Sequence, residues 1–163
     1  MEAGLEEHAR RVLERYRSAG VRLALVEACT GGLIAASLTD IPGSSAVVDL
    51  GLVPYSNESK VEMLGVAPAL LQAHGAVSGE VASAMAEAVL ARSRAEVALA
   101  ETGIAGPGGG TATKPVGLVY LAVARRGGAS VVERHVFLGD RRAVRLAAAT
   151  RGLSLLLEVL SVA

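Results

Sequence analysis

The feature that most restricts the fold is the alternation of short apolar runs with amphipathic helical patterns. Leu5, Ala9 and Tyr16 recur at helical spacing and predict a helix at residues 4–18, whereas the apolar run at 21–28 has no helical period. Such a run predicts a buried strand. The same criteria predict further helices at 33–40, 56–65, 79–92 and 140–160, and further strands at 46–55, 96–102, 116–126 and 130–138.

This order of elements predicts the fold class. Helices and strands that alternate are typical of a parallel sheet with helices on both faces. The last two predicted strands follow each other around Gly127 and Gly128, so we expect them to form an antiparallel hairpin. The sequence therefore predicts a single α/β domain over residues 1–163. It would have three layers, α/β/α, around a mixed, mostly parallel sheet of about five strands with one antiparallel strand.

Charge and cysteine content exclude several classes of partner. Sixteen basic and 16 acidic residues give a formal net charge of zero, which provides no electrostatic footprint for nucleic acid or an anionic membrane. No apolar run approaches the roughly 20 residues that span a bilayer. Cys29 is the only cysteine, so no internal disulfide can form. We therefore expect a cytoplasmic protein without nucleic-acid or membrane partners.

A glycine-rich segment, GIAGPGGGTATKP at residues 103–115, follows the strand predicted at 96–102. A dinucleotide-binding loop would open a helix, whereas another strand follows here. A P-loop would place Lys and Ser or Thr directly after its last glycine, where this chain has TATK. What remains is either a surface connection or a loop of exposed N–H groups near Lys114 that suits an anionic group. The density of glycines after a strand favours ligand binding.

The segment PYSNESK, residues 54–60, brings Tyr55 and Lys60 close together in the sequence. Their separation does not match Tyr-x-x-x-Lys, and Asn57 stands where Ser-x-x-Lys would need a serine. Lys60 is therefore either a solvated surface lysine or, if it is buried, a general base with a lowered pKa.

The remaining reactive side chains are isolated. His8, His74 and His135 are far apart and lack metal-ligand spacing, so no metal site is expected, and His74 beside Gly75 is expected to organise a turn. Cys29 would act as a nucleophile only if its pKa were lowered, and a cysteine with apolar flanks is more often simply buried.

Seven segments, in their order, closely resemble the CinA C-terminal domain family over about residues 5–160. They are EACTGG, TDIPGSS, PYSNESK, HGAVS, TGIAGPGGG, KPVG and GDR. The resemblance implies an anticodon-binding-domain-like α/β/α fold. It also implies that nicotinamide mononucleotide is hydrolysed to nicotinic acid mononucleotide and ammonia, in pyridine nucleotide salvage, without a metal or cofactor. Members commonly form homo-oligomers, and the implied partner is a small-molecule nucleotide.

The resemblance also assigns roles to individual residues. In the mechanism proposed for the family, a serine attacks the amide carbonyl and a lysine acts as base. The corresponding residues are Ala28 and Lys60, with Tyr55 beside the lysine. The resemblance further implies a set of substrate-binding residues, in which the two arginines would lie near the substrate phosphate. They are Cys29, Thr30, Gly31, Gly32, Thr102, Gly103, Gly106, Arg141 and Arg145.

Ala28 departs from the family pattern because it has no attacking atom. Pro54, Leu50 and Glu101 depart too, and Glu101 replaces a residue that is usually small or apolar. Four explanations of Ala28 stay open: an introduced Ser→Ala change, a natural loss of the nucleophile, attack by Cys29 or Thr30, and a water activated by Lys60. We favour the first two. The sequence thus predicts an amidohydrolase or, alternatively, an impaired or non-catalytic nucleotide-binding member.

Overall fold

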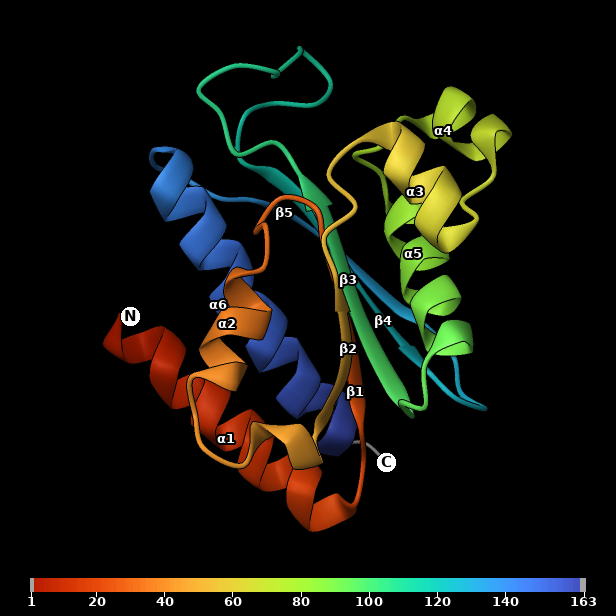
Figure 1. Ribbon diagram of the computed structural model, residues 1–163. Helices are drawn as coiled ribbons and strands as arrows, with labels where there is room; N and C mark the ends of the chain where they lie inside the picture. Colours follow the sequence, from red (N-terminus) through yellow and green to blue (C-terminus); the bar gives the residue numbers. More distant parts are fainter. Residues whose placement is uncertain (1, 162–163) are drawn as a thin grey trace.

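The computed structural model describes residues 2–161, which form three layers (Figure 1). The sheet has the order β2-β1-β3-β4-β5 and consists of β1 (Leu23–Glu27), β2 (Val48–Leu52), β3 (Val97–Gly103), β4 (Leu118–Arg125) and β5 (Val131–Val136). One face is covered by α1 (Ala3–Ala19), α2 (Leu33–Thr39) and α6 (Arg141–Ser161). The other is covered by α3 (Asn57–Leu64), α4 (Pro68–His74) and α5 (Gly79–Arg92). The predicted three-layer α/β/α fold is confirmed.

The strand directions also agree with the prediction of a mixed sheet. β1 pairs in parallel with β2 and with β3, whereas β4 pairs antiparallel with β3 and with β5. Half of the strand pairs are therefore antiparallel, yet only β4 runs against the other strands. The turn between β4 and β5 contains Gly127, whose φ of 73° favours glycine.

The core is aliphatic and is divided by the sheet. Leu23 and Leu25 of β1 face the cluster formed with α1, α2 and α6, while Ala24 and Val26 face the cluster formed with α5. Every residue of β1 is buried, because the strand lies between two neighbours and beneath helices on both faces. β1 is thus an interior strand, and the candidate site begins at its carboxyl end.

Some boundaries differ from the predictions. The strand expected at 46–55 is shorter, because a 3₁₀ helix at Ser44–Ala46 precedes β2. α4 was not predicted, since it is a short helix in which only the adjacent Leu70 and Leu71 pack on the core, which gives no recurring apolar stripe. It begins with Pro68 at its first turn and ends at Gly75. His74 is the last residue of this helix, and its ring lies 3.6 Å from Glu80 across the bend that follows, so it stands beside a turn as expected.

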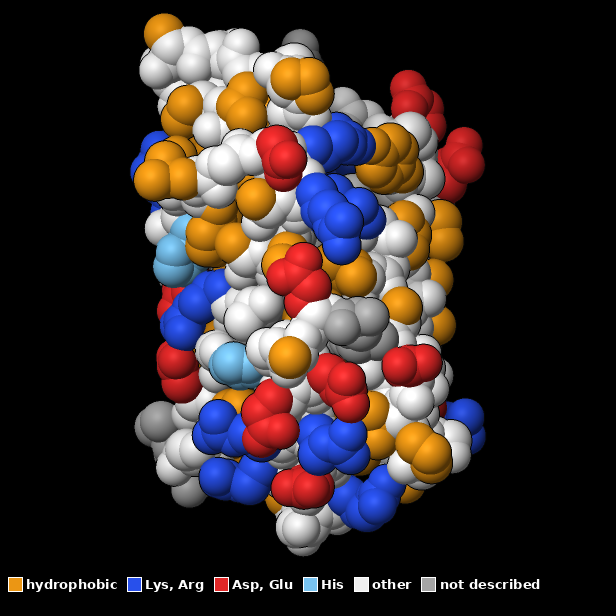
Figure 2. All heavy atoms as spheres, turned by 90° about the vertical axis from the view of Figure 1, so that its left-hand side faces the viewer, with side chains coloured by type: hydrophobic (Ala, Val, Ile, Leu, Met, Phe, Trp, Pro, Cys, Tyr) orange, Lys and Arg blue, Asp and Glu red, His pale blue; other side chains and the backbone are white. Residues whose placement is uncertain are grey.

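Figure 2 shows the outer face formed by the helices on the left of Figure 1. Acidic and basic side chains are interspersed over this face rather than separated into regions of one sign. A surface of this kind produces no extended field of one sign. Among residues 2–161, no helix is both long and apolar enough to cross a bilayer.

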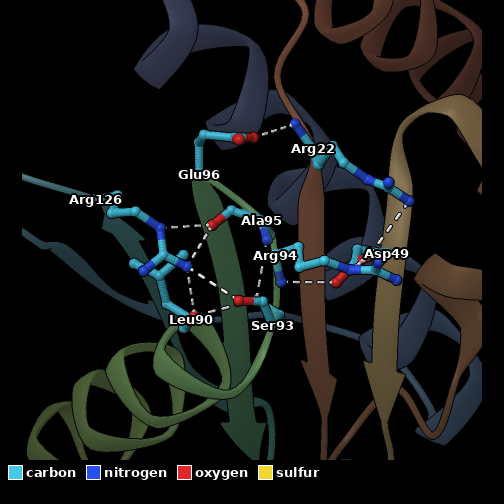
Figure 3. Close-up of polar contacts among 8 residues, drawn as sticks. All are labelled: Arg22, Asp49, Leu90, Ser93, Arg94, Ala95, Glu96 and Arg126. Atoms are coloured by element: carbon cyan, nitrogen blue, oxygen red, sulfur yellow. Dashed lines mark hydrogen bonds and ion pairs between the residues drawn. The ribbon is translucent and has the colours of Figure 1, made fainter.

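Polar contacts hold together the segments at the end of the sheet where β1 and β3 begin (Figure 3). The Arg126 guanidinium donates to the carbonyl oxygens of Leu90 and Ala95, each at 2.8 Å, and so holds the connection between α5 and β3. On the neighbouring strands, Arg22 forms an ion pair with Asp49 at 3.3 Å. These contacts fix the amino ends of the strands.

A second polar cluster joins β5 to α6. The Arg151 guanidinium donates to both carboxylate oxygens of Glu133, at 2.6 and 2.9 Å, and also contacts Glu158 at 2.7 Å. His135 lies 2.7 Å from Glu133. These hydrogen bonds, those from Arg151 above all, lower the pKa of Glu133 to about 2.

Glu133→Gln is expected to flatten the acid limb of the stability profile. The native pKa of about 2 lies below the ordinary value of 4.5, so Glu133 stabilises the fold above that ordinary value, and this stabilisation is lost as pH falls towards 2. Urea unfolding of both proteins between pH 3 and pH 7 measures the effect. An unchanged loss of stability at low pH in the variant would contradict this assignment.

Candidate active site

One cavity of about 210 Å³ lies at the carboxyl ends of β1 and β3, where two neighbouring parallel strands end side by side. Such an edge is the usual ligand position in α/β folds. Seven of the predicted site residues line the cavity: Ala28, Cys29, Tyr55, Lys60, Thr102, Gly103 and Arg141. Four residues that sequence reasoning missed complete the lining: Asn57, Ala76, Val77 and Ala105. The motifs PYSNESK and HGAVS contain the first three, but their side chains carry no distinctive chemistry.

The turn between β1 and α2 is held from two sides. The N–H groups of Cys29 and Thr30 both donate to Glu101 Oε1 at 2.8 Å. Arg145 donates to the carbonyl oxygens of the same two residues, at 3.3 and 2.6 Å. Gly31–Gly32 follows with φ of 62° and 97°, a left-handed backbone that glycine adopts at little cost. Thr30, Gly31–Gly32 and Arg145 therefore lie outside the cavity lining, and Arg145 holds the turn that carries Cys29.

Lys60 lies on α3 and is only 3% exposed. Its Nζ donates to the carbonyl oxygens of Pro54, at 3.0 Å, and Ser56, at 3.4 Å. Burial lowers the pKa of Lys60, and electrostatic interaction with the nearby Glu101 and Glu58 opposes this shift in part. A neutral amine has two N–H groups, which these carbonyls accept, and one lone pair. Of the two interpretations of Lys60, the geometry thus favours a buried base.

Tyr55 and Arg141 stand together at the mouth of the cavity. The Arg141 guanidinium donates to the Tyr55 hydroxyl at 3.1 Å and to the Gly106 carbonyl at 2.9 Å. Tyr55 is 66% exposed, so a ligand can reach it from solvent. Arg141 joins α6 to the glycine-rich loop, and its fixed positive charge suits an anionic group at the entrance.

The glycine-rich loop is shaped by packing as well as by any ligand. A Cβ on Gly103 would lie 2.7 Å from a Val119 side-chain carbon, and one on Gly106 would lie 2.5 Å from Val116. Thr102, just before the loop, donates to the Ala76 carbonyl at 2.9 Å. The early glycines therefore permit close contact with the β4 side of the chain, a reason that the sequence pattern alone does not disclose.

Lys114 does not line the cavity. Its ammonium donates to the carbonyl of His74 at the end of α4, and it thereby ties the far end of the glycine-rich loop to that helix. An anionic site at the N–H groups of the glycine-rich loop near Lys114 stays a prediction.

Two of the proposed substitute nucleophiles are poorly placed for attack. Burial, with a further contribution from Glu101, raises the pKa of the Cys29 thiol to about 12, so it is not a thiolate at neutral pH. The Thr30 hydroxyl is fully buried and bonds to Glu27 and Glu101 instead of facing the cavity. Within residues 2–161, no group of His, Cys, Asp and Glu side chains could hold a metal ion.

Comparison with known proteins gives consistent results. The family model described as the CinA C-terminal domain matches residues 5–160. A CinA-like protein of Anaeromyxobacter sp. is 51% identical over 151 residues, covering 93% of this chain and 37% of that protein. A CinA-like protein of Geobacter sulfurreducens is 51% identical over 142 residues, covering 87% and 34%. The chain thus spans about a third of the length of these curated relatives.

Solved structures of similar proteins superpose on nearly the whole of this chain. The competence/damage inducible protein CihA from Agrobacterium tumefaciens superposes with a TM-score of 0.95 at 46% identity, covering 99% of this chain and 98% of that one. A competence damage-inducible protein A from Klebsiella pneumoniae superposes with a TM-score of 0.93 at 35% identity, covering 96% and 97%.

Proposed function

Because the chain belongs to the CinA C-terminal domain family, we propose that its cavity binds nicotinamide mononucleotide and is built for hydrolysis of the nicotinamide amide, in pyridine nucleotide salvage. One observation carries the proposal: segments far apart in the sequence bring Ala28, the buried Lys60 and the paired Tyr55 and Arg141 to a single cavity. That set supplies a nucleophile position, a base and an anion-binding group.

The chemistry follows from these positions. A hydroxyl at residue 28 would attack the amide carbon while Lys60 accepts its proton. Lys60 would return the proton to the nitrogen as the C–N bond breaks and ammonia leaves. Water would then hydrolyse the resulting ester to release nicotinic acid mononucleotide. Arg141 would hold the substrate phosphate, whereas Arg145 would act through the turn that it supports.

Ala28 favours a second candidate function. Without an attacking oxygen, the same cavity would serve a non-catalytic nucleotide-binding member of the family. The buried thiol of Cys29 and the inward-facing hydroxyl of Thr30 provide no replacement. The family resemblance and the balanced charge further support a cytoplasmic homo-oligomer that binds no nucleic acid.

Ala28→Ser is expected to create or greatly increase ammonia release from nicotinamide mononucleotide. Removal of the nucleophile costs ~10⁶-fold in one dissected hydrolase, so a gain of several orders of magnitude is expected. Calorimetry with the unchanged chain measures binding, and a coupled ammonia assay measures turnover. Ala129→Ser, the same change on the exposed β4–β5 turn, is the matched control. Binding without turnover in the Ala28→Ser chain would favour the second function, and absence of binding would refute both.

A further inference from the structure

Two glutamates and a threonine form a buried chain of oxygens beneath the Cys29–Thr30 turn. Thr30 Oγ1 lies 2.6 Å from Glu27 Oε1 and 2.8 Å from Glu101 Oε1. Glu27 is 1% exposed, and Thr30 and Glu101 are fully buried. The two glutamates lie on the same face of the sheet, because the parallel register pairs residue 27 of β1 with residue 101 of β3. No step of the proposed hydrolysis uses these carboxyl groups.

If both glutamates are ionised, these three side chains contain too few hydrogens to make both oxygen–oxygen contacts hydrogen bonds. Two short oxygen–oxygen contacts need two hydrogens, and the Thr30 hydroxyl carries one. A carboxylate accepts hydrogen bonds and brings no hydrogen of its own. The second contact is a hydrogen bond only if one of the two carboxyl groups is protonated.

The surroundings of the two carboxyl groups differ. Both oxygens of Glu27 accept backbone N–H groups at the start of α2, from Ile34 at 2.7 Å and Ala35 at 2.9 Å, so each oxygen has a hydrogen-bond partner. Glu101 Oε1 accepts the two N–H groups of the turn, but its buried Oε2 has no hydrogen-bond partner within residues 2–161. An ionised Glu101 would therefore leave a charged oxygen unsolvated, which is costly. A proton on Glu101 Oε1 completes the contact with Thr30 Oγ1 and leaves Oε2 as a neutral carbonyl oxygen, so Glu101 is the better site for the proton.

We propose that Glu101 carries a proton shared with Thr30 and Glu27, and that this neutral carboxyl group positions the Cys29–Thr30 turn at the edge of the cavity. Burial, the largest influence, agrees in direction, since it raises the pKa of Glu101 to about 7. The other charged or titratable groups around the turn are Glu27, Cys29, Lys60, Arg141 and Arg145. Loss of the proton would place two carboxylates on one hydroxyl and disturb the turn.

Carbon-13 NMR of the side-chain carboxyl carbons of glutamate tests the proton directly. The chain is labelled at glutamate, titrated from pH 5 to pH 9, and its signals are assigned through the backbone. We expect Glu101 to be protonated at pH 6 and to titrate near pH 7. Ionised shifts for both groups at every pH would overturn the proposal, and a protonated Glu27 would overturn its assignment to Glu101. This readout requires no ligand and no activity.

The consequence for ligand binding rests on the proposed function. If the protonated form alone binds nicotinamide mononucleotide, affinity falls about tenfold between pH 6 and pH 8. Glu101→Gln keeps a neutral acceptor for the turn and is expected to remove this pH dependence, whereas Glu133→Gln, on β5, should retain it. A pH dependence that persists in Glu101→Gln would overturn the positioning role. Failure of the nucleotide to bind at any pH would refute the proposed function and leave the NMR result to decide the proton.

Discussion

Replacement of Lys60 by methionine in the Ala28→Ser chain is expected to lower the rate of amide hydrolysis by ~10²- to 10⁴-fold, the usual contribution of a positioned acid–base group. Methionine keeps an unbranched apolar chain in the buried position but removes the amine. Initial rates of ammonia release at saturating nicotinamide mononucleotide measure the effect. In the Ala28→Ser chain the rate should rise with pH as Lys60 loses its proton, at a pKa lowered by burial, and this rise should be absent from the methionine variant.

Lys114→Met provides the matched control, because it removes the other lysine of the chain without touching the cavity lining. Its rate and pH profile should follow those of the Ala28→Ser chain. Thermal unfolding should show that the Lys60 variant remains folded, since loss of a buried amine removes a desolvation cost. An Ala28→Ser, Lys60→Met chain with full activity would exclude Lys60 as the base.

Leu25→Ala is expected to lower the free energy of unfolding by about 2–5 kcal/mol, the range for truncating a fully buried leucine. Leu25 is 0% exposed, at the centre of β1, between two parallel neighbours and beneath the helix layer. Urea denaturation with an unchanged m-value measures the difference. Leu138→Ala makes the same chemical change at a side chain that is 88% exposed, and it should change stability very little. Equal effects at both positions would contradict the central place of β1 in the core.

The sequence pattern predicted the layers, the hairpin and most helices because each depends on local periodicity and turn residues. The predicted turn after β1 is present, and Gly31–Gly32 has the left-handed backbone that it requires. α4 was missed because it is an exposed single helix of two turns without a buried stripe. Local patterns therefore predict elements that have an apolar face and overlook those that do not.

The candidate site was only partly predictable. The lining includes Lys60 and Tyr55 as expected, but the burial that shifts the pKa of Lys60 depends on how α3 packs after β2. Glu101 was recognised as unusual from the sequence, yet its partners were not. They follow from the register of β1 and β3, which places Glu27 beside it. Distances between segments that are remote in the chain cannot be derived from residue spacing.

The contact between Glu101 and the turn also determines when the site can form during synthesis. Cys29 and Glu101 are 72 residues apart in the chain. Closing so long a loop is entropically costly, and contacts of this kind slow folding. On a ribosome, the turn after β1 emerges long before the carboxyl group that binds its N–H groups. The turn that carries the reacting position is thus translated well before the carboxyl group that fixes its geometry.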